Sequence, residues 1–162
     1  MIRVIRNIAV LAIGAFALGQ AEQIHAADVP PELMTYQGYL VDGNGKPLGS
    51  VVDPSDSTQR VSAPANYDVV FRIYNVKSGG IADWAEKQTV TVANGYFSVM
   101  LGEGATTATG EPKGNLSEVF QGSGISDRFI GMTVEGLGGA GVDVEIAPRL
   151  RFVVSPFAFT AT

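Results

Sequence analysis

The chain has 162 residues, of which 46% are hydrophobic and 17% charged, so one folded domain is expected rather than a disordered chain. Acidic residues outnumber basic ones by 16 to 11, which argues against a surface for nucleic acid or anionic lipid. The absence of cysteine excludes disulfides and thiolate catalysis, and the twenty glycines indicate many tight turns.

Residues 1–26 have the pattern of an export signal. Arg3 and Arg6 precede an uninterrupted apolar run over residues 8–18. A helix of this run, at about 1.5 Å per residue, would cross only about half of a hydrocarbon core of roughly 30 Å. The segment therefore fits a signal peptide better than a membrane span.

Two cleavage sites fit this signal, after Ala26 or after Ala27, with an uncleaved anchor as the alternative. The first site leaves 27–33 as a flexible start and 34–162 as the domain, with no stable membrane span. His25, the only histidine, would be removed with the signal. Without histidine and cysteine the mature chain lacks the side chains of the common nucleophile systems and of histidine-ligated metals, so we expect no enzyme. We expect a secreted or cell-surface protein, with the periplasm as another destination.

After the signal, apolar and polar residues alternate in short runs, which is typical of β-strands. In the run 67–76, Val69, Phe71 and Ile73 share one face, which we expect to be the core face. Strands are predicted over residues 34–41, 67–76, 81–92, 96–101, 127–135, 143–146 and 150–154.

Turn residues separate these runs. Glycine with aspartate or asparagine predicts tight turns at 42–47 and 94–95, the second a hairpin turn, and 136–141 predicts a glycine-rich turn. Pro148 predicts a break between the last two strands.

Two longer segments, 49–66 and 102–114, are predicted to be exposed loops, and 115–121 the one helical turn, capped by Asn115. About seven strands and almost no helix predict an all-β fold. The expected form is an antiparallel two-layer β-sandwich, immunoglobulin/fibronectin-like or jelly-roll-like.

Several short patterns occur in a characteristic order. They are Tyr36-Gln-Gly-Tyr-Leu-Val-Asp42, Phe71-Arg-Ile-Tyr74, Ser78-Gly-Gly80, Trp84-Ala-Glu-Lys-Gln-Thr-Val-Thr-Val92, Asn94-Gly-Tyr-Phe-Ser-Val99, Phe129-Ile-Gly-Met-Thr-Val134 and Ser155-Pro-Phe-Ala-Phe159. In this order they resemble the N-terminal β-sandwich module of bacterial secreted and surface proteins, which often precedes repeats, collagen-like tracts or tail-fibre-type domains. The resemblance implies an extracellular structural or adhesive role and carries no catalytic motif.

Asp42 and Asn44 place two oxygen-bearing side chains two residues apart, as calcium loops do, and Asp53 and Asp56 follow in the next loop. The later bidentate glutamate of the full calcium loop is absent. Calcium at Asp42 and Asn44 is one hypothesis, and a plain turn is the alternative. No other cofactor is expected.

Trp84 and Tyr74, with Tyr36 and Tyr39, form the candidate aromatic platform for a sugar ring. The alternative is that Trp84 packs in the core or at a sheet edge. Acidic pairs that a carboxylate-only hydrolase would need are expected instead to solvate the surface. These pairs are Asp83 with Glu86, Glu103 with Glu111, and Asp143 with Glu145.

At the C-terminal end, Leu150, Phe152 and Val154 need a neighbouring sheet, and Phe157 and Phe159 follow as large apolar groups. They either close the sandwich within one molecule or pair with an edge of another copy.

The sequence thus predicts a non-enzymatic structural or interaction module of the bacterial surface or extracellular matrix. Its expected partners are proteins or further copies of itself, and it is not expected to bind nucleic acid. The alternative is a carbohydrate-binding module with exposed aromatic side chains that contact glycans.

Overall fold

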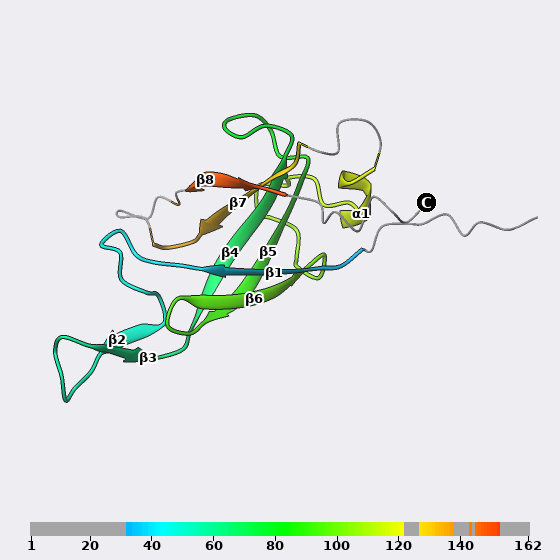
Figure 1. Cartoon of the computed structure of the whole chain (residues 1–162). Helices are drawn as coiled ribbons and strands as arrows, with labels where there is room; N and C mark the ends of the chain where they lie inside the picture. Colours follow the sequence, from blue (N-terminus) through cyan, green and yellow to red (C-terminus); the bar gives the residue numbers. More distant parts are fainter. Residues whose placement is uncertain (1–31, 122–126, 138–142, 144, 153–162) are drawn as a thin grey trace, which may run out of the picture.

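The computed structural model describes residues 32–121, 127–137, 143 and 145–152 (Figure 1). The predicted signal over 1–26, as well as Phe157 and Phe159, lies outside these residues. In the part of the chain that is described, no helix is long and apolar enough to cross a membrane.

The described residues form eight strands and one short helix. In chain order these are β1 Met34–Tyr39, β2 Ser50–Val52, β3 Arg60–Ser62, β4 Ala65–Tyr74, β5 Trp84–Val92, β6 Tyr96–Leu101, α1 Leu116–Val119, β7 Phe129–Val134 and β8 Glu145–Arg151. All strand pairs are antiparallel, so the predicted all-β class is confirmed.

The strands form a sandwich-like arrangement of two layers, with a separate hairpin (Figure 1). One layer is the β1–β6 pair and the other is a four-stranded sheet in the order β5-β4-β7-β8, while β2 and β3 pair only with each other. Val69, Phe71 and Ile73 of β4 are at most 1% exposed, which confirms the predicted core face. They pack with Leu101 of β6 in a single cluster of apolar side chains.

The tight turn at Asn94-Gly95 is present, with φ angles of 48° and 86°. Its two strands pair only at Ala93 and Tyr96 and then enter different sheets, so the prediction of a hairpin was wrong beyond the turn. The physical reason is that Val92 and Phe97 are both buried in the shared core, so the chain crosses from one layer to the other at this corner.

The segment 49–66 was predicted to be a loop, but it contains the β2–β3 hairpin, so that prediction was wrong in this respect. Val51 and Val61 lie opposite each other, and the Arg60 side chain donates hydrogen bonds to the Ser50 hydroxyl at 2.8 Å and the Ser50 carbonyl at 2.6 Å. These cross-strand contacts stabilise a hairpin that has too few apolar residues for a clear alternating pattern.

The sequence predicts two strands, 143–146 and 150–154, with a break at Pro148, but the structure has the single strand β8 there. β8 runs through Pro148 with a cis Ala147-Pro148 peptide bond and with a shift of register opposite Ile130 and Met132. Because β8 is the last strand of its sheet, a residue without an N–H is tolerated there.

The segment 102–114 is a loop, as predicted, and it covers the outer edge of β5. Lys87 and Ala105 exchange two backbone hydrogen bonds of 2.9 Å, and the Ala85 N–H donates to the Pro112 carbonyl at 2.7 Å. Asn115 stands at the start of α1, but its side chain makes no capping hydrogen bond, so the predicted cap was wrong in that detail.

Candidate functional site

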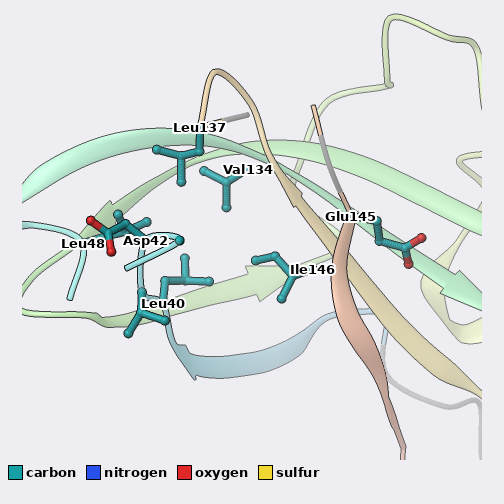
Figure 2. Close-up of a pocket in the computed structure, with 9 residues that line it drawn as sticks. Leu40, Asp42, Leu48, Val134, Leu137, Glu145 and Ile146 are labelled. Carbon is teal, nitrogen blue, oxygen red and sulfur yellow. The ribbon is translucent and has the colours of Figure 1, made fainter. Parts of the chain in front are cut away.

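An apolar cleft of about 290 Å³ lies at one end of the sandwich (Figure 2). On one side it is lined by Leu40 and Leu48, which follow β1, and on the other by Val134 of β7 and Ile146 of β8. Leu137 extends over it from the turn after β7 (Figure 2). The lining thus comes from three segments that are far apart in the sequence.

The side of the cleft after β1 is shaped by a tight turn. The Leu40 N–H donates to the Gly95 carbonyl at 2.8 Å, and the Leu48 N–H donates to the Leu40 carbonyl at 3.1 Å, which places the two leucines together. Gly49 follows with a φ of +63°, and a Cβ atom there would lie 2.0 Å from the Val92 carbonyl oxygen. Only glycine fits this close approach, so the position of Leu48 depends on it.

The floor of the cleft is buried and its rim is exposed. Leu40 and Leu48 are 3% and 7% exposed, whereas Val41, Leu137 and Ile146 are 44%, 46% and 37% exposed. A concave surface with exposed aliphatic side chains at its rim is typical of a site that accepts an apolar side chain.

The two carboxylates near the cleft are already bound elsewhere. Asp42 Oδ1 accepts the N–H groups of Asn44 and Lys46 at 2.8 Å and 2.9 Å. Figure 2 shows Glu145 on the opposite side of strand β8 from the apolar side chains, where it pairs with both Nε and Nη2 of Arg149. Of these two charged groups, Glu145 is paired with Arg149 and Asp42 is engaged by the backbone of its own turn, so the remaining lining of the cleft is mainly aliphatic.

Comparison with protein families gives one match, to the family described as "Domain of unknown function (DUF8740)", over residues 35–149. The chain belongs to this family. No curated protein matches the chain, and no solved structure matches it either.

The structure places the calcium candidates Asp42 and Asn44 in a turn of the DUF8740 domain that is closed by hydrogen bonds to the Asp42 carboxylate. The backbone N–H groups of Lys46 and then Asn44 hold the pKa of Asp42 below its usual range. Asp53 and Asp56 accept hydrogen bonds within their own loop, from Ser55 and Thr58. In the described residues no three acidic or histidine side chains come together as metal ligands.

The predicted platform of Trp84 and Tyr74 is not exposed. Trp84 is 1% exposed and its indole N–H donates to the Gly114 carbonyl at 3.0 Å, and Tyr74 is 5% exposed with the Arg149 guanidinium 3.2 Å from its ring centre. The structure therefore agrees with the alternative that Trp84 packs in the core.

Among the described residues, the exposed aromatic side chains are instead Tyr39 and Tyr96, which are 50% and 66% exposed. They lie directly opposite each other on β1 and β6. Tyr39 belongs to the platform predicted from the sequence, but Tyr96 was missed. The alternation of Tyr96 with the buried Phe97 is the signal that identifies it as outward-facing.

Glu86 does not solvate the surface, and that prediction was wrong. The residue is fully buried, and its carboxylate accepts the N–H groups of Gly102 at 3.1 Å and Gly104 at 2.8 Å, and the Gln88 side-chain amide at 2.6 Å. These three hydrogen-bond donors, together with the Lys113 ammonium group 3.8 Å away, satisfy the buried charge. Glu86 thus anchors the segment after β6 and has no cleft in which to act on a substrate.

Proposed function

We propose that this protein is an exported, non-enzymatic structural module of the bacterial surface or extracellular matrix, which binds further copies of itself. The C-terminal segment 153–162 of one copy would bind at the apolar cleft of the next. Export is supported by the pattern of residues 1–26, and the bacterial surface by the family resemblance of the strand patterns. The observation that carries self-association is the cleft itself, at the end of β8 remote from the start of the C-terminal segment.

The edges of the four-stranded sheet differ in a way that favours strand addition. The edge of β5 is covered by Ala105 and Pro112 through backbone hydrogen bonds. At the other edge, no described segment pairs with the outer side of β8. Pro148 lacks an N–H and limits pairing along this edge, so an extended peptide would add at the end of β8 beside the cleft, near Glu145 and Ile146.

The C-terminal segment has the chemistry of such a strand. Val153, Val154, Phe157 and Phe159 are β-formers, and residues 153–162 include no charged side chain. The phenylalanine rings match the aliphatic side chains of Leu40, Leu48 and Ile146 in the cleft.

The reach of the chain favours a second copy over the segment's own molecule. Phe152 donates its N–H to the Arg128 carbonyl at the end of β8 opposite to Ile146, about 20 Å away at 3.3 Å per residue. To return to its own cleft, the chain would have to reverse its direction after Phe152 and cover this distance again. A neighbouring molecule has no such restriction.

Light scattering over a range of concentrations tests this proposal on the protein that begins at Ala27. The expected result is a mass that rises with concentration for the parent chain. A chain that ends at Phe152, and the variant Ile146→Asp at the cleft rim, should both remain monomeric. Ile81→Asp is the matched control because Ile81 is 85% exposed and lies outside the cleft lining.

Circular dichroism of each variant confirms that it is folded before its mass is interpreted. A parent chain that stays monomeric at every concentration would contradict the proposal. Assembly that persists without residues 153–162 would also contradict the proposal, because another surface would then hold the copies together.

A further inference from the structure

The outer face of the β1–β6 layer carries an uncharged set of side chains. It consists of three cross-strand pairs, Thr35 with Met100, Gln37 with Ser98, and Tyr39 with Tyr96. All six side chains are exposed. In a chain with a net charge of −5, a continuous sheet face without any charged group is distinctive.

We propose that this face, the tyrosine face, binds a neutral saccharide. The aromatic rings would contact the C–H groups of a sugar ring, and the side chains of Gln37, Ser98 and Thr35 would hydrogen-bond its hydroxyl groups. Thr35 and Tyr39 are four positions apart on β1, so the face extends about 13 Å, enough for a short oligosaccharide.

The two tyrosines are held in place before any ligand binds. Their ring centres lie 4.8 Å apart with an angle of 64° between the ring planes, an edge-to-face contact. The ring of Tyr39 lies against the turn at Gly95, where a Cβ atom would come within 2.4 Å of the ring. Glycine at this position therefore leaves the space that the ring occupies, and little side-chain freedom is lost on binding.

The polar groups of the face are available to a ligand. The Gln37 amide lies 3.5 Å from the Ser98 hydroxyl, and the Thr35 hydroxyl lies 3.8 Å from the Met100 sulfur, so both internal contacts are long. Sugar hydroxyl groups can replace them without a loss of strong hydrogen bonds. A charged polymer gains nothing here, since no described side chain of the face carries an opposite charge.

The proposal does not rest on self-association, because the tyrosine face lies outside the cleft lining. Native affinity electrophoresis of the protein obtained from the full chain tests it. The gels contain hydroxyethylcellulose or dextran as neutral polymers, or alginate as a polyanion. We expect retardation by at least one neutral polymer and none by alginate.

Substitutions identify the rings that are responsible. Tyr96→Ala should weaken binding about tenfold, which corresponds to about 1.4 kcal/mol. Tyr96→Phe keeps the ring and should stay within about twofold of the parent, a change of about 0.4 kcal/mol. Ile81→Ala, at an exposed position away from the tyrosine face, is the matched control and should leave binding unchanged.

Three results would overturn the proposal. The first is no retardation by either neutral polymer, and the second is equal retardation by alginate. The third is a Tyr96→Ala variant that binds the polymers like the parent. An altered mass of that variant in light scattering would then identify the tyrosine face as a protein contact.

Discussion

Among single residues, the buried carboxylate of Glu86 shows most clearly how the pattern of a strand determines the role of a side chain. Glu86 lies on β5 two residues after Trp84 and four before Val90, so it shares their inward face. The alternation of side chains along the strand therefore indicates that Glu86 is buried, whereas the charge of its carboxylate suggests that it is exposed. The N–H groups of Gly102 and Gly104 donate hydrogen bonds to the carboxylate, and these bonds allow Glu86 to be buried.

Replacing Glu86 tests this role. Glu86→Ala should lower the free energy of unfolding by roughly 2–6 kcal/mol, because two N–H groups lose their acceptor at about 1–3 kcal/mol each. Glu86→Gln keeps one acceptor oxygen and should cost less. Urea denaturation followed by circular dichroism measures both values. Glu103→Ala, at an exposed position nearby, is the control, and equal stability of the alanine variants would contradict the anchoring role.

At the scale of the elements, alternation predicted strands but not their neighbours. The inward face of β4 and the turn at Asn94-Gly95 were predictable because both depend on residues close in the sequence. The pairing of β6 with β1 rather than with β5 was not, because it depends on which layer covers the shared core. The β2–β3 hairpin was missed for a related reason, since it is stabilised by contacts of Arg60 with Ser50 rather than by burial.

The ion pair between Arg72 and Glu111 connects the loop 102–114 to the four-stranded sheet, with Arg72 Nε 2.6 Å from the Glu111 carboxylate. The hydrogen bond from Arg72 holds the pKa of Glu111 below its usual range. A carboxylate with a lowered pKa in the folded state stabilises the fold above its unfolded pKa, and this contribution is lost as the pH falls.

We therefore expect the free energy of unfolding to fall between about pH 5 and pH 2. Glu111→Gln should lower it by about 1 kcal/mol at pH 7, since the pair is partly exposed to solvent, and the difference from the parent should shrink toward low pH. Urea denaturation at a series of pH values measures this, with Glu103→Gln as the control. A difference that stays constant down to pH 2 would show that the Glu111 charge is not responsible.

At the scale of the whole molecule, both candidate binding surfaces arise where distant segments meet. The cleft needs Leu40, Val134 and Ile146 together, and the tyrosine face needs β1 beside β6. Sequence periodicity indicates that Tyr96 faces outward and that Ile146 is apolar, but it does not place either beside its partners. The C-terminal apolar segment could be identified from composition alone, whereas its proposed binding cleft could not.

The proposed location of the protein depends on the N-terminal segment and can be tested on the full chain. Expressed in a bacterial host, the protein should appear outside the cytoplasm, and its mass should be that of a chain whose first residue is Ala27 or Asp28. The reason is that Arg3 and Arg6 precede an apolar run that is too short to span the bilayer. Intact-protein mass spectrometry of the cell fractions measures both the location and the cleavage site.

A single charge within the apolar run provides the matched test of the signal. Leu11→Arg interrupts the run and should leave the protein uncleaved in the cytoplasm, whereas Leu11→Ile preserves it and should behave like the parent. Because residues 1–26 precede the DUF8740 domain, neither change should alter the stability of the fold measured by urea denaturation. Cytoplasmic retention of the uncleaved parent chain would contradict export and, with it, the proposed role at the cell surface.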